Sequence, residues 1–427
     1  MRFASPPGLF DLLPEDGSEK WKSTYLWNHV ESLIRTISEQ FGFREMRTPI
    51  LEKQELFQRS VGETSDVVSK EMYLLQDKGG RHLALRPEGT APAMRAFLEH
   101  QLHEKSALHK LFYIGPMFRY ERAQAGRYRQ HHQWGVEAVG NDSPQQDAEV
   151  IDLLWSFYKR LGLKNLSLCI NSLGDEKARL EFKAALSAYL KPSFSSLSAE
   201  SQVRLELNPL RILDSKDERD REILKKAPSI LDFLDPNARD HFEELQKLLQ
   251  LLQIPYQINP FLVRGLDYYN RTVFEVVAGE LGAQNSIGGG GRYDGLIRDL
   301  GGPSLPAIGF GTGIERIIQT LLQQEAALPS PPRPSLFLAA LGEPAKTLTF
   351  SLLHDLREKG VSCEMDFSSK KLGKMLQYAN TLGAQYVVVI GDEEIQQGKI
   401  ELKEMATGHK QQLPLDTFSL SFASMNT

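Results

Sequence analysis

Apolar residues follow two patterns in the first 327 residues, and each pattern predicts a different element. From about Glu19 to Phe41 they recur near helical spacing, and a second helix is expected from Asp147 to Leu161. Apolar runs predict strands before Arg119, around 256–263 and around 272–277. Strand-rich segments with helices grouped between them predict an α+β domain with a mostly antiparallel sheet over residues 1–327.

The clearest domain boundary is a proline-rich segment at 328–334, Leu-Pro-Ser-Pro-Pro-Arg-Pro. Proline cannot continue a helix, and several in succession form a semi-rigid spacer. After this segment strands and helices alternate over Leu336–Leu341, Thr347–Lys359, Val361–Met365, Lys370–Leu382 and Tyr386–Ile390. The alternation predicts a small α/β domain at 335–427 around a largely parallel sheet.

The stretch at about 172–257 differs from the rest of the first 327 residues. It is charged and mainly helical in pattern, and four prolines interrupt it: Pro192, Pro209, Pro228 and Pro236. Because it separates the Arg119 region from the later strands, we expect it to be a helical insertion.

Composition narrows the class of protein. The 427 residues include 50 Lys and Arg against 55 Asp and Glu, so the formal net charge is −5. This balance argues against a DNA-coating protein, but it permits a nucleic acid bound through a local basic patch. Charged residues make up 25% of the chain and apolar residues 41%, which predicts a soluble globular protein. Cys169 and Cys363 lie outside any Cys/His array, so neither a structural zinc site nor a disulfide framework is expected.

The sequence carries no sign of membrane targeting. The N-terminus lacks the apolar core of a signal peptide, and no run approaches the roughly 20 apolar residues of a membrane span. A cytoplasmic location, with no membrane partner, is therefore expected.

The strongest chemical signal is a predicted hairpin rich in arginine. The apolar strand Leu111–Phe118 leads to Arg119, a polar turn follows, and a second strand carries Gln133 and Glu137. Three further arginines belong to it: Arg122, Arg127 and Arg129. The planar guanidinium group fits phosphate oxygens, so the hairpin predicts a surface for phosphate or nucleic acid. An exposed basic hairpin without a ligand is the alternative.

Two distant segments strengthen the interpretation of a ligand site. One reads Arg264-Gly265-Leu266-Asp267-Tyr268-Tyr269, and the other reads Gly309-Phe310-Gly311-Thr312-Gly313-Ile314-Glu315-Arg316. With the hairpin as motif 2 and the glycine-rich segment as motif 3, the chain resembles the histidyl-tRNA synthetases among the class II aminoacyl-tRNA synthetases. The peptide beginning at Arg264 is similar to the signature peptide of that family, and Phe43 to Met72 resembles motif 1. The resemblance covers nearly the whole chain.

The resemblance implies a histidine–tRNA ligase. Such an enzyme joins L-histidine to ATP, forming histidyl-adenylate and pyrophosphate, and then transfers histidyl to the 3′ end of tRNA(His). It implies a homodimer formed through motif 1, Mg²⁺ on the outer phosphates of ATP, an anticodon-binding domain at 335–427 and an insertion that leans over the tRNA acceptor end. The rival interpretation is a non-catalytic paralogue, the regulatory subunit of a phosphoribosyltransferase. Such chains tend to lose the Arg264 peptide and the C-terminal domain, and both are present here.

The resemblance also implies roles for the arginines. Arg119 would hold the α-phosphate and the histidine carboxylate, and Arg264 would occupy a place that other class II enzymes leave to a metal ion. Arg316, with Glu121, would bind ATP, and its place at a helix start also favours anions. In the hairpin loop, Arg122 and Gln124 would contact the tRNA acceptor stem. The alternative interpretation of any one of these arginines, taken alone, is a surface ion pair.

A second set of residues would select histidine. The resemblance places the imidazole on Glu137 and Tyr269, with Tyr268 beside them, and the α-amino group on Glu88, Thr90 and Gln133 next to Gly89. Adjacent aromatic residues on a strand are expected to direct one ring into the core and the other outward, where it could line a pocket. The alternative for the segment around Glu88 is a plain turn before a helix that Thr90 caps.

Two further segments carry weaker expectations. The run Gly288–Gly291 is interpreted as a loop that lets the backbone approach a ligand, and the family commonly has a larger residue, such as alanine, where this chain has Gly289. On the C-terminal domain, Lys370, Lys371 and Lys374 are candidates for holding tRNA phosphates, with a solvated helix face as the alternative.

Overall fold

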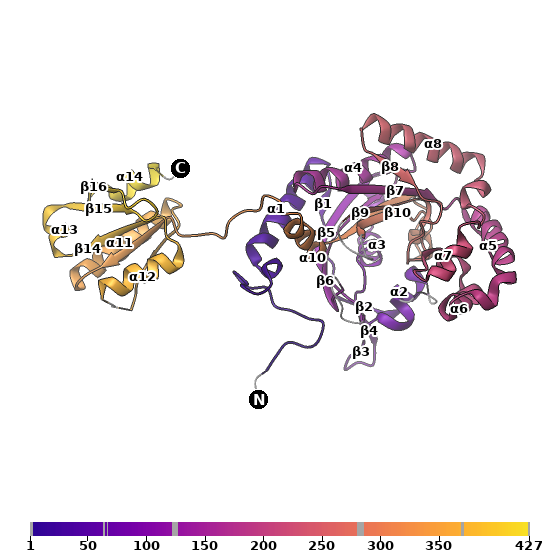
Figure 1. The fold of residues 1–427 in the computed structure, drawn as a ribbon, viewed down its shortest axis with the longest axis horizontal. Helices are drawn as coiled ribbons and strands as arrows, with labels where there is room; N and C mark the ends of the chain where they lie inside the picture. The colour runs from indigo at the N-terminus through magenta and orange to yellow at the C-terminus, as the bar shows by residue number, and fades with distance from the viewer. Residues whose placement is uncertain are drawn as a thin grey trace. The chain divides into compact units, whose positions relative to one another are not determined.

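The computed structural model describes residues 3–62, 65, 67–121, 127–279, 286–368 and 371–425. The chain divides into two compact units, Met1–Pro329 and Ser330–Thr427. Each unit has its own sheet and its own core (Figure 1).

The first unit is built on an eight-stranded sheet with the order β1-β5-β6-β11-β10-β9-β7-β8. Its strands are β1 (Arg44–Glu45), β5 (His109–Phe118), β6 (Gln130–Val139), β7 (Leu166–Ser172), β8 (Tyr256–Ile258), β9 (Asn270–Ala278), β10 (Ser286–Arg292) and β11 (Ala307–Gly313). Neighbouring strands are antiparallel except at the two edges, where β1 joins β5 and β7 joins β8 in parallel. The predicted mostly antiparallel sheet is therefore confirmed.

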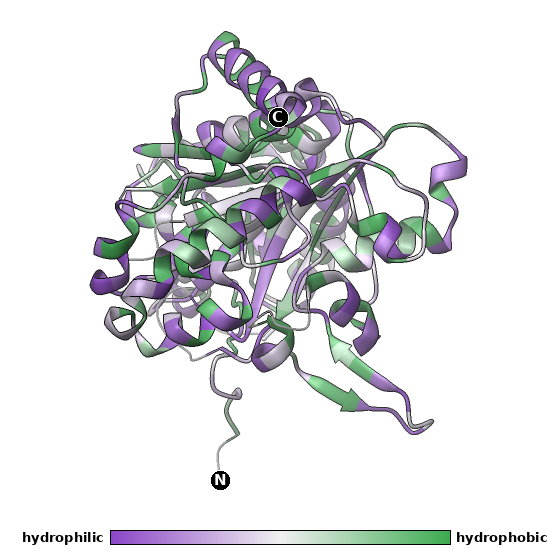
Figure 2. Ribbon diagram, turned by 90° about the vertical axis from the view of Figure 1, so that its right-hand side faces the viewer, coloured by the Kyte–Doolittle hydropathy of each residue, from purple (hydrophilic) through white to green (hydrophobic). Residues whose placement is uncertain are grey.

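Helices cover one face of this sheet and form the main core with it. They are α1 (Thr24–Gln40), α4 (Pro144–Arg160), α8 (Pro236–Leu251) and α10 (Ile314–Gln323). Strand β6 contributes Trp134, Val136 and Ala138 to this core, all of them buried. The helical ribbons around the sheet carry apolar and polar residues in alternation, as amphipathic helices do (Figure 2).

The other face of the sheet packs against smaller elements. Helices α3 (Thr90–Glu99) and α9 (Leu296–Asp299) form a second core with it, which includes Phe97, Tyr113 and Tyr293. A separate antiparallel sheet has the order β2-β4-β3, and α2 packs beside it. These elements are β2 (Leu51–Lys53), α2 (Gln54–Val61), β3 (Leu74–Gln76) and β4 (His82–Leu85).

Two predicted boundaries in the first unit are wrong for local reasons. The helix expected from Glu19 begins at Thr24, because Ser23 is extended (φ −77°, ψ 122°) and ends a short 3-10 turn at Lys20–Lys22. The strand expected at 256–263 ends at Ile258, because Asn259 and Pro260 begin a turn that the Asn259 side chain closes on Phe261 N–H at 3.1 Å.

The stretch at 172–257 is mainly helical in the structure. It contains α5 (Glu176–Leu190), α6 (Ala199–Leu207), α7 (Glu218–Leu224) and α8, with 3-10 segments between them. Helices α5, α6 and α7 share a core that also includes Leu262, Tyr269 and Val273. Helix α8 instead packs into the main core. Pro209 and Pro236 begin helical segments, because the first turn of a helix needs no N–H partner.

The second unit has a five-stranded sheet with the order β13-β12-β14-β15-β16. Its elements are β12 (Leu336–Ala340), α11 (Glu343–Glu358), β13 (Cys363–Met365), α12 (Leu372–Leu382), β14 (Tyr386–Ile390), α13 (Asp392–Gln397), β15 (Lys399–Glu404), β16 (Lys410–Pro414) and α14 (Phe418–Met425). Strands β13, β12 and β14 are parallel, and the hairpin β15–β16 adds two antiparallel strands. The predicted strand–helix alternation is present, and α11 begins four residues earlier than predicted.

A buried ionic network ties the helix layer to the sheet of the first unit. Arg292 and Asp147 are both fully buried and lie 2.6 Å apart, and the second Asp147 oxygen lies 2.8 Å from His241 Nε2. Arg292 also donates to the carbonyls of Asn141 and Ser143 at 3.2 and 3.1 Å. Strand β10 and helices α4 and α8 are thus joined through one carboxylate.

Replacing that carboxylate should destabilise the first unit strongly. Asp147→Ala leaves a buried guanidinium without its main partner, which typically lowers the free energy of unfolding by about 3–5 kcal/mol. Urea denaturation followed by circular dichroism measures the change. The control is Asp299→Ala, which breaks an exposed pair with Arg298 and should cost less than about 1 kcal/mol. Equal losses in the two variants would contradict the role of the network.

Candidate active site

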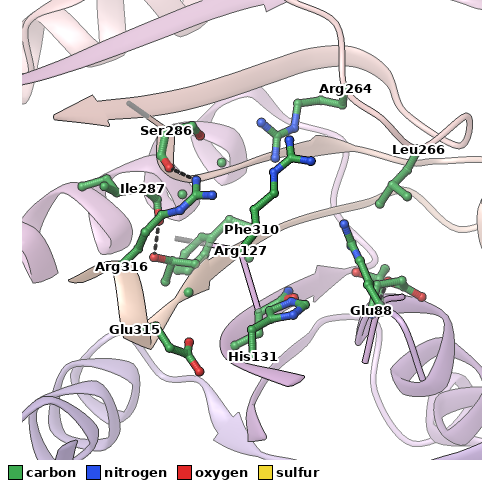
Figure 3. A pocket seen from close by; sticks show the side chains of 18 of the residues that line it. Glu88, Arg127, His131, Arg264, Leu266, Ser286, Ile287, Phe310, Glu315 and Arg316 are labelled. Atoms are coloured by element: carbon green, nitrogen blue, oxygen red, sulfur yellow. Dashed lines mark hydrogen bonds between the residues drawn. The ribbon is translucent and has the colours of Figure 1, made fainter. Parts of the chain in front are cut away.

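A cavity of about 320 Å³ opens on the face of the sheet away from α1 and α4. Nine of the residues predicted for the site line it: Glu88, Thr90, Arg119, Glu121, Gln133, Arg264, Tyr268, Tyr269 and Arg316. Arg264 from an irregular segment, Arg316 from the first turn of α10 and His131 from β6 reach the same space (Figure 3). Segments up to 228 residues apart in the sequence, from Glu88 to Arg316, therefore meet in one place.

Strand alternation explains which residues of β6 face the cavity. His131 and Gln133 line it, while His132 and Trp134 point to the helix-covered face. His132 there donates its backbone N–H to Glu315 at 2.8 Å and packs edge-on against Trp27. The period of two along a strand thus separates ligand-facing from core-facing positions.

Glu88 lies at the start of α3 and caps it. Its buried carboxylate accepts the backbone N–H groups of Thr90 and Ala91 at 2.7 and 2.9 Å. The alternative that Thr90 is the N-cap is wrong, because Thr90 is the first helical residue and Glu88 supplies the capping oxygens. Burial raises the pKa of Glu88, and the two N–H groups oppose that shift. The carboxylate retains lone pairs for a further donor.

The arginines of the hairpin separate into different environments. Arg119 follows β5, lines the cavity and donates Nε to the carbonyl of Pro87 at 2.9 Å. Arg127 also lines the cavity, with its guanidinium 3.0 Å from Glu121. Arg129 instead lies 4.1 Å over the Tyr120 ring and donates to the Pro7 carbonyl, so it fixes the N-terminal segment. The predicted acceptor-stem residues, Arg122 and Gln124, lie outside the described residues.

The Arg264 peptide forms an irregular segment and not a strand. Arg264 donates to Glu275 of β9 at 3.0 Å, and both side chains are partly exposed. Because residues 264–269 precede β9, the predicted alternation of the two tyrosine rings is wrong. Tyr268 and Tyr269 both line the cavity, with ring centroids 4.7 Å apart. Burial raises the pKa of both hydroxyls, so both are neutral donors.

The glycine run belongs to strand β10 and not to a loop. Its residues pair with β9 on one side and β11 on the other. A Cβ atom at Gly289 would lie 2.6 Å from the Phe274 carbonyl oxygen and 2.9 Å from a guanidinium nitrogen of Arg264. Glycine at this position therefore lets Arg264 lie against the strand in the arrangement seen.

Arg316 stands in the first turn of α10. Its guanidinium donates to the carbonyl of Ser286, and burial lowers its pKa, with the nearby Arg127 charge acting in the same direction. Its neighbour Glu315 is buried, and one carboxylate oxygen of Glu315 has no hydrogen-bond partner among the described residues. The sequence reasoning did not assign a ligand-facing role to Glu315, although its position next to Arg316 after the glycine-rich segment is a usable signal.

Glu137 lies one layer behind the cavity wall, and it is fully buried. Its carboxyl accepts the hydroxyl of Tyr113 at 3.1 Å and that of Tyr293. Burial raises its pKa from 4.5 to about 8. A Cβ atom at the facing Gly309 would come within 2.2 Å of a Glu137 oxygen, so a glycine there makes room for the carboxyl. Gly89, the other predicted residue, is also absent from the lining.

His131 is a cavity residue that the sequence reasoning missed. Burial lowers its pKa to about 3, and the charge of Arg119 acts in the same direction. The ring is therefore neutral near pH 7, and the cationic groups of the lining are its arginines. His131 lies two residues before Gln133 on β6, so both face the same side of the sheet, and this spacing could have predicted it.

The fold and the site together define a class II aminoacyl-tRNA synthetase. The mostly antiparallel sheet, the hairpin that delivers Arg119 and the strand that leads into α10 through Glu315 and Arg316 are its elements. Comparison with known proteins narrows the class. A family model described as histidyl-tRNA synthetase matches residues 8–317, and one described as an anticodon binding domain matches residues 336–422. The chain belongs to the histidyl-tRNA synthetase family.

Individual relatives agree with the family models. A histidine–tRNA ligase of Protochlamydia amoebophila (strain UWE25) is 64% identical over 416 residues, covering 97% of this chain and 98% of that protein. One of Caldanaerobacter subterraneus subsp. tengcongensis is 46% identical over 412 residues, covering 96% and 97%. The crystal structure of apo S. aureus histidyl-tRNA synthetase matches with a TM-score of 0.83 at 35% identity, covering 99% of this chain and 100% of that one.

Among the described residues, no helix is both long enough and apolar enough to cross a membrane.

The buried carboxyl of Glu137 should make stability depend on pH. Its folded-state pKa of about 8 lies above the ordinary value of 4.5, so between these values the native state keeps a proton that the unfolded state has lost. Its contribution to stability is therefore greatest at low pH and falls as pH rises towards 8, by at most about 1.4 kcal/mol per pH unit. Denaturation of the wild type and of Glu137→Gln at pH 5, 6, 7 and 8 compares the slopes. The Gln variant, which cannot titrate, should decline less steeply; parallel slopes would contradict the assignment.

Proposed function

We propose that this chain is a histidine–tRNA ligase whose cavity makes histidyl-adenylate from L-histidine and ATP and then transfers histidyl to the 3′ end of tRNA(His). The observation that carries the proposal is the convergence of Arg119, Arg264 and Arg316 on the residues suited to an amino acid, in a member of the histidyl-tRNA synthetase family. Histidine-dependent exchange of pyrophosphate into ATP by the purified chain tests it, because that exchange requires both ligands in one site.

In the first step the histidine carboxylate attacks the α-phosphorus of ATP and pyrophosphate leaves. Negative charge grows on the α-phosphate oxygens in the transition state, so cations fixed beside them lower the barrier. We assign this role to Arg119 and Arg264. The Pro87 carbonyl and the Glu275 carboxylate already orient the two guanidinium groups, which reduces the reorganisation required when ATP binds.

The outer phosphates lie, in this proposal, towards Arg316 and Glu121. Arg316 projects from the first turn of α10, where the helix dipole also favours an anion. Mg²⁺ commonly binds through substrate phosphates with one or two carboxylates, and it neutralises phosphate charge when bound. Glu121 and Glu315 are the carboxylates on this side of the cavity, and the unpartnered oxygen of Glu315 suits such a role.

Histidine lies, in this proposal, at the opposite end of the lining. Glu88, Thr90 and Gln133 offer acceptors to the α-amino group, next to Gly89. The imidazole is held by Tyr269 and Glu137, with Tyr268 beside them. Thr90 lines the cavity and is close enough to the Glu137 carboxyl to lower its pKa, so a ligand ring that inserts past Thr90 reaches that carboxyl. A neutral imidazole offers one donor and one acceptor, which this pair complements.

The remaining assignments concern the rest of the chain. Residues 1–327 act as the catalytic domain with a helical insertion at about 172–257, 328–334 as the linker and 335–427 as the anticodon-binding domain. The enzyme works as a homodimer in the cytoplasm. Exposed apolar residues near motif 1 support the dimer: Ile50, Leu51, Leu74 and Leu75. Arg122 and Gln124 contact the acceptor stem, and Lys371 and Lys374 contact tRNA phosphates; Lys370 lies outside the described residues.

Removing the Arg264 guanidinium should nearly abolish adenylate formation while the fold survives. Loss of one transition-state donor typically costs about 3–4 kcal/mol, roughly a hundred- to a thousandfold in rate. Pyrophosphate exchange by Arg264→Ala measures this, and Arg298→Ala, which removes an exposed arginine, is the control. Near-normal exchange by the Arg264 variant would remove Arg264 from the mechanism.

Cutting the chain after Leu328 should separate the two activities. Every residue assigned to adenylate formation precedes the cut, and residues 1–329 have their own cores, so the shortened chain should fold and retain pyrophosphate exchange. It should charge tRNA poorly, because the domain assigned to the anticodon is missing. Two results count against the assignment: unchanged charging of tRNA would contradict the anticodon role, and lost exchange would show that the second unit supports the catalytic site or the dimer.

A further inference from the structure

Two phenylalanines of the second unit are exposed and lie in contact. Phe350 of α11 and Phe367, just after β13, are 59% and 65% exposed. Their ring centroids lie 6.4 Å apart in an edge-to-face arrangement. The unit's other phenylalanines, Phe337, Phe418 and Phe422, are buried. Folding of this unit therefore leaves one aromatic pair in water, where its apolar surface is uncompensated.

The pair lies where α/β sheets bind ligands. Strands β12 and β13 are parallel neighbours, and the helix that follows each strand packs on a different face of the sheet. Helix α11 joins the core on one face through Leu352, Leu353 and Leu356, and α12 joins the other through Met375 and Ala379. A crevice is expected outside the carboxyl ends of two such strands. Phe367 follows the end of β13 directly, and Phe350 contacts it from α11.

Two lysines follow Phe367 closely in the sequence. Lys371 precedes α12 and Lys374 lies in its first turn, and both are exposed. Neither lysine has an ion-pair partner among the residues that the structure describes. The acidic residue nearest to them in the sequence, Asp366, is mostly buried and accepts the backbone N–H of Ser368 at 2.9 Å. The segment that follows β13 thus brings an exposed aromatic ring together with two exposed lysines that have no ion-pair partner among the described residues.

We propose that Phe350 and Phe367 form a stacking surface for an unpaired base of the tRNA anticodon loop, with Lys371 and Lys374 on the adjoining phosphates. Single-stranded RNA is commonly bound by stacking its bases on exposed aromatic rings beside a cationic groove. The match of residues 336–422 to an anticodon binding domain favours this ligand over a protein partner. The inference rests on the proposed function only in taking tRNA as the RNA that is bound.

The test separates loss of the ring from loss of apolar bulk. Phe350→Leu, Phe367→Leu and their double variant keep apolar side chains without a ring, while Phe350→Tyr and Phe367→Tyr keep the ring. In the full-length protein, each Leu variant should raise the KM for tRNA about tenfold to a hundredfold, in line with the loss of one stacked base. The Tyr variants should behave like the wild type. Leu420→Ala, which changes another exposed apolar side chain of this unit, is the control and should leave the KM unchanged.

Two further measurements make the outcome specific. Pyrophosphate exchange, and charging of a minihelix that carries only the acceptor stem, should be unchanged in every variant. Direct binding of an isolated anticodon stem-loop should weaken in the Leu variants only. This measurement does not depend on catalysis, so it still tests the stacking surface if the wild type shows no histidine-dependent exchange and the proposed function fails. The proposal is overturned if the Leu variants bind and charge tRNA normally, if the Tyr variants lose binding equally, or if sedimentation shows that the Leu variants change self-association instead.

Discussion

The alternation of side chains along strand β6 is the constraint on which the first unit depends. Trp134 and Val136 enter the helix-covered core, while Gln133 and Glu137 point to the face that carries the cavity. A slip of one residue in the pairing of β6 would exchange the two sets and bury the polar one against the helices. The pairing with β11 fixes the register, since Gly309 lies opposite Glu137 and leaves space for its carboxyl. Core packing and ligand chemistry are therefore set by the same register.

The arginines of the cavity are held in place without a ligand. Arg119 donates to a backbone carbonyl, Arg264 to the carboxylate of Glu275 and Arg316 to another backbone carbonyl. Such contacts use some of the N–H donors of each guanidinium group and leave the others for an anion. The neutral His131 ring fits the same arrangement, because its burial and, to a lesser extent, the nearby charge of Arg119 disfavour a further cation there. The cavity is thus prepared for negative charge by the orientation of its donors.

The sequence predicted which segments form the site more reliably than how deeply their side chains are buried or which local conformation they adopt. The hairpin and the sheet type follow from periodicity and turn residues, which are local properties, whereas the helix start at Arg316 was implied by the resemblance to motif 3. The two tyrosines did not follow the predicted strand alternation, because Arg264–Tyr269 is an irregular segment whose path depends on its contacts with Glu275 and Arg179. The position of Glu137 behind the cavity wall depends on hydroxyls from Tyr113 and Tyr293, and the Asp147–Arg292 pair joins residues 145 positions apart. Pairings of that kind are fixed by tertiary packing, which no local pattern contains.

Net charge is a poor guide to the ligands of this chain. The formal charge of −5 would suggest repulsion of ATP and tRNA, yet four arginines line one cavity: Arg119, Arg127, Arg264 and Arg316. At physiological ionic strength, charges more than about 8 Å from a ligand are largely screened where solvent reaches them. A phosphate in the cavity therefore responds to the arginines within reach and hardly at all to acidic residues elsewhere on the surface. Local placement of cations by the fold, rather than their number in the sequence, is what makes an acidic chain compatible with polyanionic substrates.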